Sequence, residues 1–247
     1  MAAVARLGRW AADASGNRVP GSMNTILSAI LDNNQARVRK LLEADRGLAI
    51  QRVKEAKLYQ SKIFHWLYAG DTALHLAAAG YRETIARTLL AAGADPNASA
   101  NHRRSRPLHY AADGYIVGPA WDPKRQVKTI RILLKAGADI HAGDKNGATA
   151  LHRAVRTRCA AAVCCLLDAG ADPTQTNLSG STAFHLAVQN TGRGGSGAEI
   201  AIAAQRQIIE ELLSFGVSPG LKDGKGKSVS DCATSSWIRN LLSEYAA

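Results

Sequence analysis

Apolar and polar positions recur along this chain in paired blocks, which predicts pairs of short helices repeated several times. The first block opens with a polar turn, continues into an alanine-rich apolar stretch and always contains a histidine. Its copies are GDTALHLAAA from Gly70, SRPLHYAADG from Ser105, GATALHRAVR from Gly147 and GSTAFHLAVQ from Gly180. Successive histidines (His75, His109, His152, His185) lie 34, 43 and 33 residues apart. The near-constant period predicts stacked copies of one structural unit.

A second apolar block follows each histidine and predicts the second helix of each pair. Its copies are LLAAGADPN from Leu89, LLKAGADIH from Leu133, LLDAGADPT from Leu166 and the weaker LLSFGVSPG from Leu212. A glycine closes every copy, because glycine readily adopts the left-handed conformation of a helix C-cap. A threonine such as Thr149 can cap the first helix, and the histidine three residues later can bond that hydroxyl and the neighbouring repeat.

This pattern resembles the ankyrin repeat, whose period is about 33 residues and whose T-P-L-H signature opens a helix pair. The resemblance extends from about Asn24 to Ala247. It implies an all-α fold, an ankyrin-repeat solenoid of stacked helix pairs with hairpin loops. We expect about six repeats, of which four are full and two are caps, because a single unit cannot bury its own apolar face. The resemblance also implies a partner bound across the hairpin tips and the inner helices.

The phase of the signatures gives the expected domain boundaries. We expect a poorly ordered extension over 1–23, a capping repeat over 24–45, full repeats over 68–100, 101–143, 144–176 and 177–222, and a second cap over 223–247. The stretch 46–67 is an insertion that we expect to form an amphipathic helix, and its apolar points include Leu58, Ile63, Phe64, Trp66 and Leu67. Insertions at 114–122 and 191–204 fall between helices.

One repeat departs from the pattern. Arg104 and Arg106 replace the usual glycine and threonine of the third repeat, so we expect a distorted hairpin there.

Composition narrows the functional classes. No apolar run reaches the roughly 20 residues that cross a bilayer, and residues 1–20 lack the apolar stretch of a secretory signal. The four cysteines show no paired spacing, so neither a disulfide framework nor a zinc cluster is expected. We therefore expect a cytoplasmic protein that does not associate with a membrane. The net charge of +11 has two explanations, an acidic partner or, more commonly, solvated charge with no partner, and residues 101–150 alone carry nine basic and four acidic side chains.

No arrangement of residues predicts catalysis. The four repeated histidines occupy equivalent positions, so we interpret them as buried structural residues rather than metal ligands. Cys165 takes a core position and Cys164 faces outward, with no base beside them. The glycine-rich stretch at Gly192 lacks the lysine of a phosphate-binding loop. We expect no enzyme activity, no catalytic residue, no cofactor and no metal.

The candidate site is therefore a surface. By position in the repeats, the partner-binding residues are predicted to be Tyr68, His102, Arg103, Tyr110, Asp113, Lys145, Asn146, Arg153, Arg156, Gln189 and Asn190. Arg103, Lys145, Arg153 and Arg156 should make the middle of the groove basic. The leading hypothesis is a monomeric, non-catalytic adaptor or scaffold that binds an acidic segment of another protein. Nucleic-acid binding through the basic groove and a role as the regulatory subunit of an enzyme are the alternatives.

Overall fold

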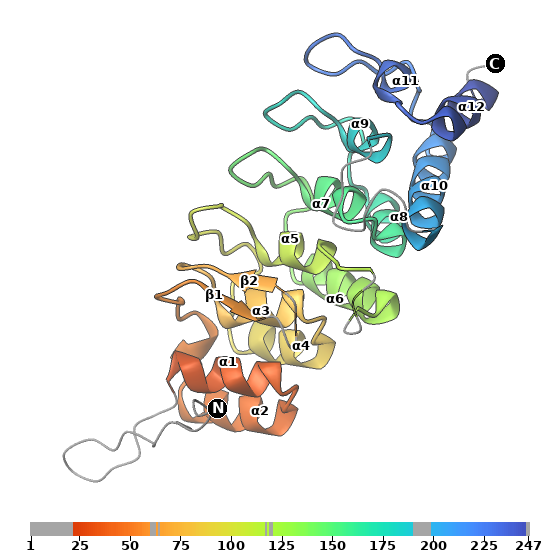
Figure 1. The fold of residues 1–247 in the computed structure, drawn as a ribbon. Coiled ribbons are helices and arrows are strands. Elements are labelled where there is room, and N and C mark those ends of the chain that lie inside the picture. The colour runs from red at the N-terminus through yellow and green to blue at the C-terminus, as the bar shows by residue number, and fades with distance from the viewer. Residues whose placement is uncertain are drawn as a thin grey trace, which may run out of the picture.

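The computed structural model describes residues 22–59, 63, 65–116, 118, 121–189 and 199–245. These ranges form six helix pairs that stack in chain order into an elongated array, with the first and last pairs at opposite ends (Figure 1). The predicted all-α stack is confirmed.

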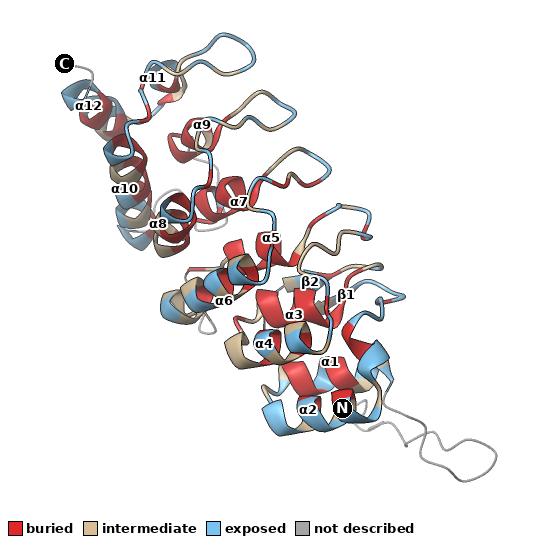
Figure 2. Ribbon diagram, turned by 180° about the vertical axis from the view of Figure 1, so that it is seen from behind, coloured by how far each residue is buried: buried red, intermediate tan, exposed pale blue. Residues whose placement is uncertain are grey.

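Each pair places one helix in an inner layer and one in an outer layer. The inner helices are α1 (Met23–Leu31), α3 (Ala73–Ala79), α5 (Pro107–Ala112), α7 (Ala150–Arg156), α9 (Ala183–Ala187) and α11 (Val229–Cys232). The outer helices are α2 (Gln35–Ala44), α4 (Glu83–Ala91), α6 (Pro123–Lys135), α8 (Ala160–Asp168), α10 (Glu199–Ser214) and α12 (Ser236–Glu244). Buried residues concentrate along the inner helices, where alanines such as Ala77 and Ala154 allow close approach (Figure 2).

The repeated histidines fasten neighbouring units, as predicted. At His152, Nδ1 lies 2.9 Å from the hydroxyl of the N-cap Thr149, and Nε2 lies 3.1 Å from the carbonyl oxygen of Ser181 in the next repeat. A carbonyl only accepts, so Nε2 carries a hydrogen, and Nδ1 accepts from the Thr149 main-chain N–H at 3.3 Å, so the ring is neutral. The same bond from Nε2 to the following repeat recurs at the other three positions, His75, His109 and His185.

Left-handed backbone closes the helices, with one departure from the usual residue type. Gly93 and Gly137 have φ of 100° and 87°, as the predicted C-caps require. Tyr81 and Arg158 have φ of 53° and 62° after the inner helices α3 and α7, where a side chain costs strain. Both side chains make hydrogen bonds that offset this strain. The Tyr81 hydroxyl donates to the Asp113 carbonyl oxygen at 2.6 Å, and Arg158 donates to the Gln189 carbonyl oxygen at 2.7 Å.

The turns between repeats project as a row of fingertips, at residues 68–71, 101–105, 144–148, 177–181 and 223–227 (Figure 1). Main-chain hydrogen bonds join successive fingertips, from Lys145 N to Arg103 O at 2.8 Å, from Leu178 N to Asn146 O and from Gly224 N to Gly180 O. Among the described residues, the first fingertip is joined to the second through side chains, because Asn101 Nδ2 donates to Asp71 Oδ1 at 2.7 Å.

The third repeat keeps the turn of its neighbours, but its hairpin closes differently, because Asn101 Nδ2 rather than a main-chain N–H donates to the Ser105 carbonyl oxygen. Asn101 Oδ1 accepts from the main-chain N–H groups of Arg103 and Ser105, as Asp144 Oδ1 does from Asn146 and Ala148. Arg104 takes the glycine position with φ of 51° and keeps the turn intact. The buried asparagine therefore determines the hairpin, and the replaced glycine does not disrupt it.

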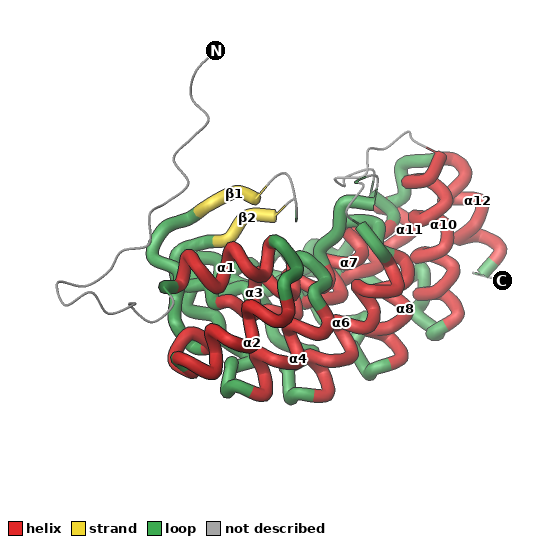
Figure 3. The backbone as a smooth tube through the Cα atoms, turned by 90° about the horizontal axis from the view of Figure 1, so that it is seen from below, coloured by secondary structure: helices red, strands yellow, loops and turns green. Residues whose placement is uncertain are grey.

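The expected helix over 46–67 is also wrong. The segment forms a 3-10 helix η1 (Arg46–Ala49) and a β-hairpin of β1 (Lys57–Tyr59) and β2 (His65–Leu67), in which Leu58 pairs with Trp66. Leu67 is buried and Trp66 points the other way, which is the alternation of a strand. The hairpin lies over the inner-layer side of α1 and α3, away from the outer helices (Figure 3). Phe64 lies outside the described residues.

Candidate functional site

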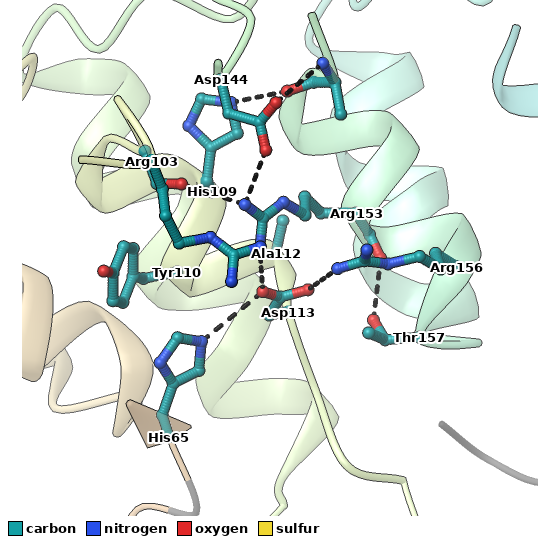
Figure 4. A network of polar contacts seen from close by, with 12 residues as sticks. His65, Arg103, His109, Tyr110, Ala112, Asp113, Asp144, Arg153, Arg156 and Thr157 are labelled. Atoms are coloured by element: carbon teal, nitrogen blue, oxygen red, sulfur yellow. Dashed lines mark hydrogen bonds and ion pairs between the residues drawn. The ribbon is translucent and has the colours of Figure 1, made fainter. Parts of the chain in front are cut away.

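Six of the predicted site residues converge where β2, the second fingertip, α5 and α7 meet (Figure 4). A small cleft of about 20 Å³, which is room for one or two water molecules, opens there. Its lining residues are His65, Trp66, Tyr68, Arg103, Ser105, Tyr110, Asp113, Arg153 and Arg156. Six of the predicted site residues thus lie together here, but several of their side chains are buried in the stack rather than exposed.

Arg153 was predicted to be an exposed groove cation, and this is wrong. The side chain is buried (5% exposed), and its two terminal nitrogens donate to Asp113 Oδ2 and Asp144 Oδ2, each at 2.7 Å. One of them also donates to the Ser105 hydroxyl at 2.9 Å. This Arg153 network (Arg153, Ser105, Asp113 and Asp144) ties together the second and third fingertips, the end of α5 and the helix α7. The positive charge of Arg153 is already balanced by the carboxylates of Asp113 and Asp144, so its guanidinium is not available to a binding partner.

Asp113, predicted to contact the partner, belongs to the same network and is buried. Burial alone would raise its pKa, but Arg153, His65 and Arg156 lower it, and the result lies well below the ordinary value. His65 Nε2 lies 3.5 Å from Asp113 Oδ2, and Arg156 lies 3.8 Å from Oδ1. For Asp144, too, Arg153 outweighs burial and lowers the pKa. Both carboxylates are therefore charged at neutral pH.

Tyr110 was predicted to lie on the surface and is instead 2% exposed, so that prediction is wrong. Its hydroxyl donates to Asp71 Oδ2 at 2.6 Å. Burial, and then the charge of Asp71, raise the pKa of Tyr110 well above its usual value, so the phenol stays protonated and donates. Asp71 also accepts from the Tyr68 main-chain N–H and from Asn101, which leaves it fully bonded inside the stack.

The accessible part of the region is aromatic and cationic. Trp66 is 42% exposed and stacks against Tyr68, with ring centroids 6.3 Å apart and planes 18° apart. Tyr68 meets His102 edge to face at 4.9 Å, and Arg103 lies over the Tyr68 ring at 5.4 Å while donating to its hydroxyl at 3.0 Å. The Arg156 side chain is 46% exposed at the rim.

The remaining predicted residues follow the fingertips away from the cleft. Lys145 and Asn146 are exposed on the third fingertip. Gln189 is half-buried, and its carbonyl oxygen accepts from Arg158 at 2.7 Å. Asn190 lies outside the described residues.

Sequence reasoning missed His65 and placed Trp66 on a helix. The sequence of His65, Trp66 and Leu67 carries no alternation that would indicate a strand, because Trp66 and Leu67 are both apolar. The burial of Asp71 had no local signal, because its partner Tyr110 is 39 residues away.

The described residues contain no group of three or more His, Cys, Asp or Glu side chains arranged to hold a metal ion. Burial raises the pKa of Cys159 to about 11, which keeps this thiol protonated and weakly nucleophilic at neutral pH. The described residues also include no helix with the length and apolar character of a membrane span.

Comparison with known proteins was made for sequence families and for structures. Models of the ankyrin repeat match residues 69–101 and, as three copies, residues 120–223. An ankyrin repeat domain from Acinetobacter baumannii is similar in structure, with a TM-score of 0.61 and 23% identity over 91% of this chain and 95% of that one. The ankyrin repeat protein EF0377 gives a TM-score of 0.63 and 22% identity over 91% and 97%. A search of curated proteins finds no match. At these identities the structural likeness concerns the fold alone.

Proposed function

Since the chain belongs to the ankyrin-repeat family, whose members are generally protein-interaction modules, we propose that it is a non-catalytic adaptor for an acidic segment of another protein. The segment binds along the fingertips and the accessible rim of the inner helices, from Tyr68 and Arg103 toward Lys145 and Arg156. The adaptor acts as a monomer.

The observation that carries this proposal is the arrangement of charge at the fingertips, where carboxylates are buried and cations are exposed. The carboxylates of Asp71, Asp113 and Asp144 are buried, whereas the cationic ends of Lys145 and Arg156 reach solvent. A partner that approaches the fingertips therefore meets cations first. Fixed cations over a chain of net charge +11 favour an acidic segment and speed its association.

Nucleic acid is the weaker alternative. Single-stranded nucleic acid is held by exposed aromatic rings that stack on bases, together with cations along the backbone. The ring of Tyr110 is buried and its hydroxyl is bonded to Asp71, so it is not available to stack on a base. A regulatory subunit of an enzyme would use the same surface, and it is a special case of protein binding.

The test is direct binding of a fluorescein-labelled glutamate-rich peptide, measured by fluorescence anisotropy. The double variant Lys145→Gln/Arg156→Gln should weaken binding at least tenfold, or about 1.4 kcal/mol. The control is Lys128→Gln/Lys135→Gln on the outer helix α6, which removes the same charge from exposed positions and should leave affinity unchanged.

A salt series separates the alternatives. A polynucleotide loses affinity linearly in log salt with a slope near one per phosphate contact, so a steep slope with oligothymidylate and no peptide binding would favour nucleic acid. Equal affinities for both double variants would contradict the proposed surface.

A further inference from the structure

We propose that the β1–β2 hairpin provides a rigid apolar contact beside the cationic rim, so that the protein selects acidic segments that carry an apolar side chain next to their carboxylates. The contact is the Trp66 patch, defined as Trp66, Tyr68, His102 and Arg103. This inference rests on the proposed function and specifies the partner that the same surface takes.

The patch is ordered before any partner arrives. Tyr68 is held from three sides, by stacking on Trp66, by the edge of His102, and by Arg103, which both covers its ring and bonds its hydroxyl. Side chains held in one arrangement lose little rotamer entropy on binding, so more of the contact energy appears as affinity. Trp, Tyr and Arg are also the residue types that dominate binding energy in protein interfaces.

The hairpin that carries Trp66 is anchored to the helical stack. A two-stranded hairpin is marginally stable alone, so its position depends on contacts outside itself. Leu67 and Ile63 are buried, and a Cβ built on Gly80 at the end of α3 would lie 2.7 Å from Ile63 Cδ1. The His65 ring lies 4.6 Å from the ring of Tyr110 and 3.5 Å from Asp113. Trp66 is therefore a fixed exposed side chain rather than part of a loose loop.

Charge and apolar surface occur together at one place. Trp66, Arg103 and Arg156 line the same cleft, and Arg153 already bonds one oxygen of each buried carboxylate beneath it. The cleft is too small for a whole side chain, so a partner lies across its mouth. A carboxylate there faces Arg103 and Arg156, while a neighbouring apolar side chain covers Trp66. A purely acidic segment would leave Trp66 exposed.

Base stacking is the competing use of an exposed tryptophan beside arginines. One side of the Trp66 ring already stacks on Tyr68, and the Tyr68 ring is covered by Arg103. The patch therefore offers one apolar surface rather than a series of open rings. We accordingly assign it to a protein segment.

The test uses two labelled peptides of equal length and charge, one with leucines among its glutamates and one with serines in their place. With the full chain, the leucine peptide should bind at least tenfold more tightly by fluorescence anisotropy. Trp66→Ala should reduce its affinity to that of the serine peptide and leave the serine peptide unchanged. The control is Phe215→Ala, which removes a similarly exposed aromatic ring (45%) after α10 and should affect neither peptide.

The outcomes separate this inference from the proposed function. If both peptides bind equally and Lys145→Gln/Arg156→Gln weakens both, the adaptor proposal stands and the Trp66 patch does not select apolar side chains. If neither peptide binds, both proposals fail. If oligothymidylate binds more tightly than the peptides and depends on Trp66, the patch serves nucleic acid. Trp66→Phe guards against misfolding, because it keeps an aromatic ring and should retain most of the preference.

Discussion

Replacing Arg153 by methionine should destabilise the protein strongly, because Asp113 and Asp144 would remain buried without their cation. Arg153 donates to both carboxylates at 2.7 Å from a side chain that is almost fully enclosed. Breaking a buried ion pair from one side typically costs about 3–5 kcal/mol, since the remaining charge is not solvated. Arg153→Met should fall in this range, whereas Arg156→Met, at a half-exposed position, should cost about 1 kcal/mol or less.

The pH dependence of stability tests the same buried ion pairs independently. In the native protein the pKa values of Asp113 and Asp144 are lowered, so these groups contribute stability above their unfolded pKa of about 3.8. That contribution is lost as pH falls through the lower folded values. Without Arg153, burial should raise the pKa values of Asp113 and Asp144 above the unfolded value. Protonation in acid should then remove the buried negative charges and restore part of the variant's stability. The stability difference between native protein and variant should therefore narrow from pH 7 toward pH 4.

Urea unfolding followed by circular dichroism at several pH values measures both effects. The reasoning would be refuted if Arg153→Met lay within about 1 kcal/mol of the native protein at pH 7, or if the difference widened in acid. Because Arg153 is buried and ion-paired, reversing its charge should also destabilise the protein. For this reason, binding tests should use Arg156 and Lys145 rather than Arg153.

Three further predictions concern the stack. Burial, followed by the charge of Arg153, lowers the pKa of His109 to about 4. The protein should therefore lose about 3 kcal/mol of stability from this group as pH falls from 6.5 to about 4. Urea melts of His109→Gln should show a shallower decline. Asn101→Asp should cost about 2 kcal/mol or more in thermal or urea melts, because Asn101 Nδ2 donates to Asp71 and an aspartate would face that carboxylate. An effect as small as that of Asp223→Asn would contradict this account of the second fingertip. Truncation after residue 215 removes α12 with its buried Ile238, so aggregation detected by light scattering is expected, and a monomer that melts like the intact chain would refute the role of the last helix pair as a cap.

The stack was predictable because its determinants are local and repeated. Each threonine, histidine and glycine acts within a few residues of its own position or on the neighbouring repeat. Thr149, His152 and Ser181 illustrate this, since the first two are three residues apart and the third belongs to the next copy of the pattern. Four copies of such a pattern determine where every repeat begins, so a single weak copy does not change the predicted fold.

The hairpin and the buried ion pairs were not predictable in the same way. Strands of three residues, such as Lys57–Tyr59 and His65–Leu67, are too short to distinguish period 2 from the period of a helix. The burial of Arg153 depends on Asp113, 40 residues earlier in the chain, and on how two inner helices meet. Position in the repeat placed Arg153 on the correct side of the molecule, but it could not show that a neighbouring repeat supplies its counter-ion.

The way the fingertips are joined has a consequence for how the molecule tolerates sequence change. From the second fingertip onward, the joins use main-chain atoms, as between Lys145 and Arg103, so almost any side chain preserves them. The join between the first and second fingertips uses side chains, from Asn101 to Asp71 and from Arg103 to Tyr68, so substitutions there can weaken it. Diversity can therefore accumulate along most of the row without altering its spacing. The first fingertip, which carries the hairpin, depends on particular side chains to stay in line with the others.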